Sequence, residues 1–106
     1  MSNIKLTNSV KLAFESLAGN IDTTNVVSNM AASGGNDIDW TATTDCFFFH
    51  YSCYPEHTKI DSVSLFTPGM PNTAYVSACG YLKSGAKFHT ASDGARPCYF
   101  RAFGLK

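Results

Sequence analysis

The sequence predicts a mainly β fold, an antiparallel β-sandwich with a short N-terminal helix. From Ile38 onward, apolar runs of four to ten residues, rich in aromatic and β-branched side chains, alternate with turn clusters. This is the pattern of all-β domains. A helical spacing of apolar residues occurs only before Gly19. With 106 residues the chain is one domain, which we divide into a helical attachment or linker segment at residues 1–20 and a sandwich domain at residues 21–106.

The segment from Ile4 to Leu17 is predicted to form the helix. Its apolar residues are spaced 4, 3 and 4 positions apart, which places them on one side of a helix, and Gly19-Asn20 ends it. A helix of about three turns is too short to be stable alone in water. We therefore expect it to pack on its own domain or on copies from neighbouring chains. The apolar positions are Leu6, Val10, Ala13 and Leu17, with Phe14 beside them.

The later elements are predicted in order from their own runs and turns. Val26-Val27 is an apolar island within a polar stretch and predicts a short edge strand between two loops. Gly-rich and Asp-Gly clusters mark the turns after it. We expect the remaining strands at residues 38–43, 46–53, 59–66, 73–81, 86–91 and 96–105.

The strands at 46–53 and 97–105 are largely apolar on both faces. Side chains alternate across a strand, and aromatic residues occupy odd and even positions of both segments. Fully burying a Phe side chain is worth about 1.5–3 kcal/mol relative to exposing it, so the second face needs cover from the N-terminal helix or from a second copy of the domain. Of these two kinds of cover we infer the second copy, and hence oligomerisation. The expected interface or core residues are Phe47, Phe49, Tyr51, Tyr99, Arg101, Phe103 and Leu105.

Charge and hydropathy exclude several classes of protein. Eight basic and eight acidic residues cancel without forming runs, so no basic stripe for nucleic acid is visible. No apolar stretch approaches the ~20 residues that span a bilayer, and no cationic helix face suits a membrane surface. The first five residues lack the apolar region of a signal peptide. We expect synthesis in a cytoplasm, followed by retention there or release by another route such as cell lysis.

The cysteines and histidines match no catalytic or metal site. Cys46, Cys53, Cys79 and Cys98 form no C-x-x-C pair and no zinc spacing. Three disulfide pairings are open, and we expect reduced thiols at synthesis, with two of them, Cys46 and Cys98, buried as small apolar groups. His50 shares a strand face with Cys46 but lies about 13 Å away; it is expected to be a core or interface histidine, or else one of three copies that hold a metal at a trimer axis. Paired carboxylates and a Gly-rich phosphate loop are missing from the sequence, so we predict a non-enzymatic protein without cofactors.

Arg101 and three polar loops are the remaining features. A lone buried arginine is costly, so we expect Arg101 to pair with Asp45 or Asp61. Stacking on Tyr99 or Phe103 of a neighbouring copy is the alternative. Loops on a rigid sandwich often bind partners, so one interpretation is that these three loops bind a receptor. The other interpretation is that they only connect strands. The candidate receptor residues on them are Tyr54, Glu56, His57, Met70, Asn72, Asp93 and Arg96.

Several stretches resemble one family. Trp40-Thr41-Ala42-Thr43-Thr44-Asp45-Cys46, with the apolar strand after it, resembles the opening of the C1q/TNF-like jelly-roll heads of bacteriophage tail fibres. Residues 81–90 resemble the penultimate element of those heads, in which a turn enters a strand. Residues 98–106 resemble their aromatic final strand, and residues 6–15 are similar to the helical linkers that precede them.

The resemblance implies a jelly roll that assembles as a homotrimer in a virion. The chain is then expected to be a receptor-binding or tip domain of a tail fibre or spike, which attaches to a host-surface glycan or protein. Its N-terminal segment, through Leu6, Val10, Phe14 and Leu17, is expected to contact other virion proteins. The alternative is a capsid decoration or head-fibre protein that stabilises the particle. An adhesion or toxin-like C1q module of a bacterium is a third possibility.

Overall fold

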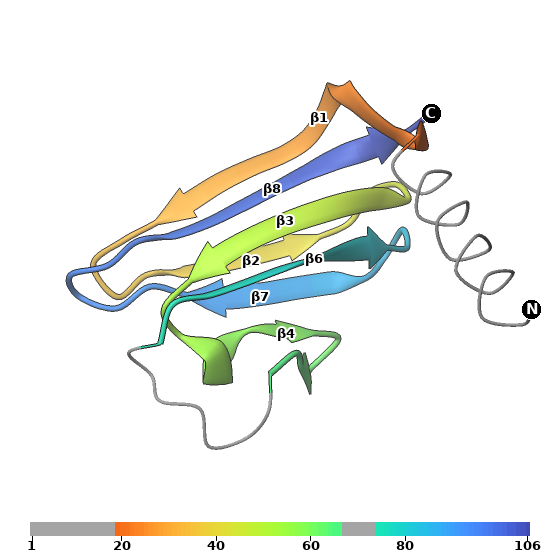
Figure 1. The fold of residues 1–106 in the computed structure, drawn as a ribbon. Helices are drawn as coiled ribbons and strands as arrows, with labels where there is room; N and C mark the ends of the chain where they lie inside the picture. Colours follow the sequence, from red (N-terminus) through yellow and green to blue (C-terminus); the bar gives the residue numbers. More distant parts are fainter. Residues whose placement is uncertain (1–18, 67–73) are drawn as a thin grey trace, which may run out of the picture.

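The computed structural model describes residues 19–66 and 74–106, which form two four-stranded antiparallel sheets (Figure 1). Sheet A contains, in spatial order, β1 (Ile21–Ala32), β8 (Cys98–Leu105), β3 (Cys46–Ser52) and β6 (Val76–Leu82). Sheet B contains β2 (Asp37–Thr41), β7 (Lys87–Ala91), β4 (Lys59–Ile60) and β5 (Val63–Ser64). A 3-10 turn, η1 (Pro55–His57), precedes β4. The mainly β, antiparallel fold class predicted from the sequence is confirmed.

The two sheets pack face to face around an aromatic core. Phe88 of sheet B stacks on Phe100 of sheet A with ring centroids 4.4 Å apart, and Phe48 of sheet A lies 5.2 Å from Phe88. Trp40 of sheet B also contacts Phe100, at 5.4 Å. These side chains come from the inward positions of their strands, so burial of the inward faces holds the layers together.

The alternation predicted for the two aromatic strands is confirmed. The inward residues of β3 and β8 are almost inaccessible, since each of seven is 4% exposed or less. They are Cys46, Phe48, His50, Ser52, Cys98, Phe100 and Ala102. The intervening residues of both strands point away from sheet B and form the outer face of sheet A.

β1 is much longer than the short edge strand predicted at Val26-Val27. It runs twelve residues along the edge of sheet A and pairs with β8. Its polar residues face solvent, and three apolar side chains, Val27, Met30 and Ala32, pack against the core. Two register irregularities in its first half interrupt the alternation, as β-bulges do. A polar edge strand of this kind has no periodic apolar signal in the sequence, which is why the prediction was too short.

The single strand predicted at 59–66 is wrong, because the segment contains the hairpin of β4 and β5. Asp61 and Ser62 form its turn with φ angles of 49° and 68°, which lie in the left-handed region that two-residue hairpin turns use. The Asp61 carboxylate accepts a hydrogen bond from the backbone N–H of Lys87 at 2.9 Å, and this bond fastens the turn to β7. The turn predicted before β2 is confirmed, with Gly34 and Gly35 at φ angles of 65° and 83°.

The ends of the sheets differ in what they carry. At one end, which we call the terminal end, the backbone N–H of Lys106 donates to the carbonyl oxygen of Asn20 at 2.7 Å. At the other end, the loop end, lie the connections 33–36, 53–58 and 92–97 (Figure 1). The backbone N–H of Gly35 donates to the carbonyl oxygen of Asp93 at 3.1 Å and ties two of these connections together.

Some predictions fall on residues outside the described ranges. The helix expected at 4–17 lies there, and so do six of the predicted site residues. They are Leu6, Val10, Phe14, Leu17, Met70 and Asn72. Within residues 19–66 and 74–106, no helix has the length and apolar character needed to cross a membrane.

Candidate interaction face on sheet A

The outer face of sheet A carries three rows of side chains that run across its four strands. Residues directly opposite each other in antiparallel strands point to the same side, so the strand register defines the rows. Row 1, nearest the terminal end, contains Tyr81, Phe47, Phe103 and Val26. Row 2 contains Cys79, Phe49, Arg101 and Asn29. Row 3, nearest the loop end, contains Ser77, Tyr51, Tyr99 and Ala31.

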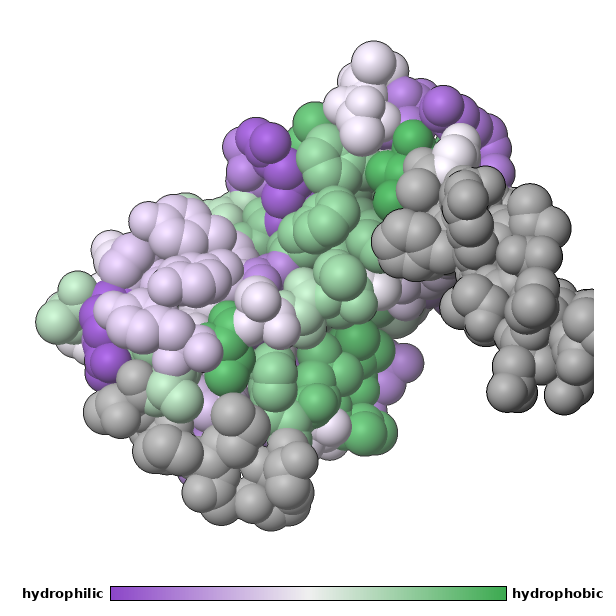
Figure 2. Space-filling view, in the orientation of Figure 1, coloured by the Kyte–Doolittle hydropathy of each residue, from purple (hydrophilic) through white to green (hydrophobic). Residues whose placement is uncertain are grey.

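Large aromatic side chains stay exposed on this face. Five rings, those of Phe49, Tyr51, Tyr75, Tyr81 and Tyr99, are each between 42% and 56% exposed. Figure 2 shows the apolar surface gathered across the middle of the face, with pale, weakly polar rings clustered toward the loop end. Contiguous apolar patches on a small domain generally mark a contact surface. We name this surface the aromatic face.

The rings of the aromatic face hold one another in place. Phe47 contacts Phe49 at 5.2 Å and Tyr81 at 5.0 Å between ring centroids, and it is only 7% exposed as a result. Tyr51 stacks on Tyr75 at 5.5 Å. Aromatic pairs at such distances add to the energy of burial, so the face presents an ordered layer to a partner. Of the predicted interface residues, Phe47 is already covered by its neighbours within the chain.

The seven predicted interface residues come together as one set on two neighbouring strands. Phe47, Phe49 and Tyr51 of β3 lie opposite Phe103, Arg101 and Tyr99 of β8, in that order. The seventh residue, Leu105, follows Phe103 by two positions on the same strand and is half-buried. The sequence placed these residues on two strand faces, and the pairing of β3 with β8 joins the two faces into one.

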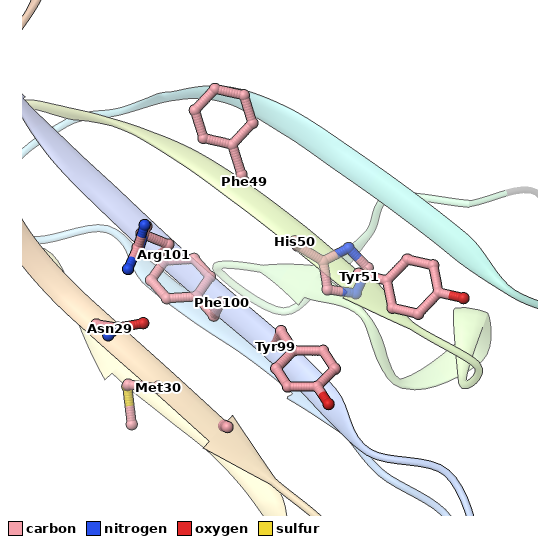
Figure 3. A pocket seen from close by; sticks show the side chains of 9 residues that line it. Asn29, Met30, Phe49, His50, Tyr51, Tyr99, Phe100 and Arg101 are labelled. Atoms are coloured by element: carbon pink, nitrogen blue, oxygen red, sulfur yellow. The ribbon is translucent and has the colours of Figure 1, made fainter. Parts of the chain in front are cut away.

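A groove of about 440 Å³ lies over rows 2 and 3. Figure 3 shows that Phe49 and Tyr51 project from β3 and that Arg101 and Tyr99 project from β8, with Asn29 on the neighbouring strand β1. None of the residues that line the groove is acidic. The side chains of rows 2 and 3 among them contribute aromatic rings, phenol hydroxyls, one amide and one guanidinium, and Met30, His50 and Phe100 also line the groove.

The pairing expected for Arg101 is wrong. The Asp45 carboxylate accepts a hydrogen bond from the backbone N–H of Ser84 at 2.9 Å, and that of Asp61 is bonded to Lys87. The Arg101 guanidinium instead lies 5.8 Å from the ring centroid of Phe103 in its own chain. Among the residues that the structure describes, it makes no ion pair. It thus remains a cation on the aromatic face that no carboxylate neutralises.

The loop end gathers most of the predicted receptor residues. Tyr54, His57 and Asp93 line a hollow of about 320 Å³ there, together with Asp37. The Tyr54 and His57 rings meet edge to face at 4.4 Å, and the Glu56 carboxylate lies 3.4 Å from the imidazole of His57. The structure therefore brings two of the three predicted loops to one place, and the third, at Met70 and Asn72, lies outside the described residues.

Asp93 and Arg96 organise the loop end and are not free side chains. Arg96 donates from Nε to Asp93 Oδ2 at 2.8 Å, and the backbone N–H of Ala95 donates to the same carboxylate at 3.0 Å. These donors, the Arg96 side chain first among them, lower the pKa of Asp93 to about 2. The Arg96 guanidinium also lies 5.6 Å over the ring of Tyr75. The pair thus connects the loop end to the aromatic face.

His50 lies in the core between the sheets, as one sequence interpretation expected. It is 4% exposed, and its Nε2 is 2.7 Å from Ser52 Oγ, while its Nδ1 has no partner among the described residues. Burial lowers the pKa of His50 to about 4. Since the ring is enclosed by its own domain, copies of His50 cannot meet at a symmetry axis to hold a metal.

The burial predicted for Cys46 and Cys98 is confirmed, since both are fully buried. Cys53 is buried as well, Cys79 is exposed in row 2, and all four are free thiols. Burial raises the pKa of the Cys46 and Cys98 thiols, which makes them poor nucleophiles.

One cluster of potential metal ligands was missed by sequence spacing. Asp37 and Asp39 of β2 and His89 of β7 place three donor atoms within 4.8 Å of one another. Asp39 and His89 are register partners, and His89 Nδ1 lies 2.7 Å from Asp39 Oδ1. The two positions are 50 residues apart, so only the pairing of β2 with β7 reveals the group. Exposed groups of this kind are common without an ion.

Comparison with family models, with curated proteins and with solved structures found no match to this chain.

Proposed function

We propose that this chain is the trimeric head of a virion spike or tail fibre, a non-enzymatic domain that binds the host surface. The observation that carries the proposal is the aromatic face. Five rings between 42% and 56% exposed on one sheet surface favour burial against another molecule. The expected place of action is the virion, after synthesis in the host cytoplasm.

We further propose that the two sheets form a jelly roll. Rolling one long antiparallel hairpin of eight strands pairs the first strand with the last, the second with the seventh, and so on inward. Successive pairs then alternate between two sheets. The pairs β1·β8 and β3·β6 occur in sheet A, and β2·β7 and β4·β5 occur in sheet B. This strand order supports the proposal and agrees with the family resemblance of the sequence.

The contact between copies is centred on row 1 of the aromatic face. The residues of row 1 are aliphatic and aromatic, but the Arg101 guanidinium of row 2 lies over the Phe103 ring. We therefore expect the contact on the Tyr81 and Phe47 side of row 1, where a partner copy leaves few polar atoms unsatisfied. Tyr81 and Val26 are its exposed members, at 42% and 47%. In a cyclic trimer the three contacts are equivalent and head to tail, and the ring closes on itself. Row 1 also lies at the terminal end, which leaves the loop end directed away from it (Figure 1).

The loop end suits the receptor because it is remote from row 1. Its hollow carries two aromatic rings from the connection 53–58 and the carboxylates of Asp37 and Asp93, and loops on a rigid scaffold are common recognition elements. Attachment through the N-terminal segment at Leu6, Val10, Phe14 and Leu17 completes the proposal. That segment joins the domain at Gly19, whose neighbour Asn20 is bonded to Lys106 at the terminal end.

Light scattering on the purified chain tests the assembly. A trimer has three times the 11.5 kDa mass of the chain, and we expect that mass at micromolar concentration. Tyr81→Glu places a charge in row 1 and should give a monomer with unchanged circular dichroism. Thr41→Glu, an exposed substitution on β2 of sheet B, is the matched control and should remain trimeric. A monomeric wild-type chain at micromolar concentration contradicts the proposal.

Labelling of virus particles tests the location. We expect antibodies against the chain to mark the tips of spikes or tail fibres on particles from the host that produces it. Uniform labelling of the capsid shell supports instead a decoration or head-fibre protein. Labelling of the bacterial surface without particles would favour the adhesion module.

A further inference from the structure

We propose that the groove over rows 2 and 3 binds a carboxylate-bearing sugar, such as an acidic residue at the end of a surface glycan. This goes beyond the receptor contact proposed at the loop end, because it assigns a second contact on the aromatic face, and it depends on the proposed function for the source of the ligand. The first support is charge. The groove contains the Arg101 guanidinium, has no acidic residue in its lining, and Arg101 makes no ion pair within residues 19–66 and 74–106.

Arginine is suited to a carboxylate in such a place. Its planar fork donates two parallel hydrogen bonds to the two oxygens of one carboxylate. The guanidinium is held over the Phe103 ring at 5.8 Å, so less conformational freedom is lost when a ligand binds. Asn29, the register partner of Arg101 on β1, adds an amide that donates to and accepts from hydroxyl groups.

The second support is the pair of tyrosines in row 3. Tyr51 and Tyr99 are register partners and are 44% and 49% exposed, and both line the same groove as Arg101 (Figure 3). A sugar ring has an apolar C–H face that packs on an aromatic ring and a rim of hydroxyls that hydrogen-bond to phenols. Tyrosine offers both an apolar body and a polar tip.

The third support is that the tyrosines are positioned in advance. Tyr51 stacks on Tyr75 at 5.5 Å with 20° between the ring planes, Arg96 covers Tyr75, and the Asp93 carboxylate holds Arg96. A contact chain therefore runs from the loop end to the groove. The volume of the groove, about 440 Å³, falls in the usual range for small-molecule sites, ~300–1,000 Å³.

Other occupants fit the groove less well. A second copy of the chain would have to bury Arg101 and Asn29 against its own apolar side chains, which is costly without partners. Nucleic acid requires several cations for its phosphates, and the groove contains one. A peptide with a C-terminal carboxylate shares the anion but lacks the rim of hydroxyls that the two phenols and the amide would meet.

A titration followed by saturation-transfer NMR tests the proposal, with N-acetylneuraminic acid and glucuronic acid as probes. We expect both to bind, and methyl glucoside, which has no carboxylate, to bind at least tenfold more weakly. Arg101→Gln and Tyr99→Ala should each weaken binding of the acids at least tenfold. Lys87→Gln, which removes a cation from the outer side of sheet B, is the matched control and should change nothing.

Four results would overturn the inference. Three concern the sugars: equal binding of the neutral sugar, unchanged binding by Arg101→Gln, and absence of binding by both acids at tens of millimolar. The fourth is equal or tighter binding of a neutral peptide through its C-terminal carboxylate. Light scattering on the same samples separates this test from the proposed assembly. A monomer that binds the acids contradicts the trimer alone, and a trimer that binds neither acid contradicts the groove alone.

Discussion

Phe88 of β7 and Phe100 of β8 stack with ring centroids 4.4 Å apart and 29° between their planes. Each ring is 1% exposed, and each comes from a different sheet, so this one contact joins the two layers. The remaining core rings, Phe48 and Trp40, pack around it.

Phe100→Ala is therefore expected to lower the free energy of unfolding by about 3–5 kcal/mol, the usual cost of a Phe-to-Ala cavity. Urea denaturation followed by circular dichroism measures it. Tyr99→Ala is the matched control on the same strand, because Tyr99 is 49% exposed on the outer face, and its effect on the monomer should be much smaller. Equal losses for the two variants would show that the sheets do not depend on the stacked pair.

Stability is expected to fall when the pH is lowered from 7 to 4. Burial lowers the pKa of His50 in the folded state from 6.5 to about 4, so the unfolded chain binds a proton in this range and the folded chain does not. The stabilisation is complete above pH 6.5 and is lost as the pH falls toward 4, with a total of roughly 3 kcal/mol. Urea denaturation at several pH values measures the loss.

His50→Gln isolates this contribution, because glutamine keeps a polar side chain but does not titrate. Its stability between pH 6.5 and 5 should change less than that of the wild-type chain. Parallel pH profiles for the two proteins would contradict the assignment to His50.

Asp93→Ala is expected to loosen the loop end without unfolding the sheets. The carboxylate accepts backbone hydrogen bonds from Ala95 at 3.0 Å and Arg96 at 2.7 Å, so both amides lose their acceptor. Hydrogen exchange should speed up at these two amides by tenfold or more, while exchange at Phe48 and Phe100 stays unchanged. Low pH should have a related effect on the wild-type chain, since the stabilisation by Asp93 is lost as the pH falls from 3.8 toward its pKa of about 2. Unchanged exchange at both amides would contradict this role.

Cys79 offers a reporter of assembly. It is the exposed thiol of the four cysteines and lies in row 2, two positions from Tyr81 on β6. Alkylation of native protein should be confined to Cys79, and its rate should fall at concentrations where copies associate. In Tyr81→Glu the rate should not depend on concentration. Equal rates in the dilute and concentrated wild-type chain would place the contact elsewhere.

The strongest features of the fold were predictable from the sequence because they depend on local patterns. The period of two along residues 46–53 and 97–105 sorted their side chains into two faces, and the structure shows that the face with Phe48 and Phe100 is the inward one. Features that depend on the pairing of strands were not predictable. The polar strand β1 has no apolar period of its own and is recognisable only by its partner β8. The turn at Asp61-Ser62 has positive φ angles without a glycine, so the sequence contains no Gly or Pro signal for a turn there.

The candidate site likewise has a part that was predictable from local patterns and a part that depends on strand pairing. Exposed aromatics on two strands were expected from alternation, but their union into one face depends on the register of β3 with β8. The partner of Arg101 was predicted wrongly, since composition does not say that Asp45 and Asp61 are used to fasten turns. Asp37, Asp39 and His89 meet only across paired strands.

The strand order also constrains how the chain folds during synthesis. β8 lies in the interior of sheet A, between β1 and β3, yet it is the last described strand to leave the ribosome. Until it emerges, β1 has no neighbour, and the core lacks Phe100. The sandwich can therefore be completed only after β8 has been made, and folding is expected to be slow, because long chain loops close before most contacts form. In that interval the aromatic strand β3 has one edge unpaired, so this step is the one most vulnerable to aggregation.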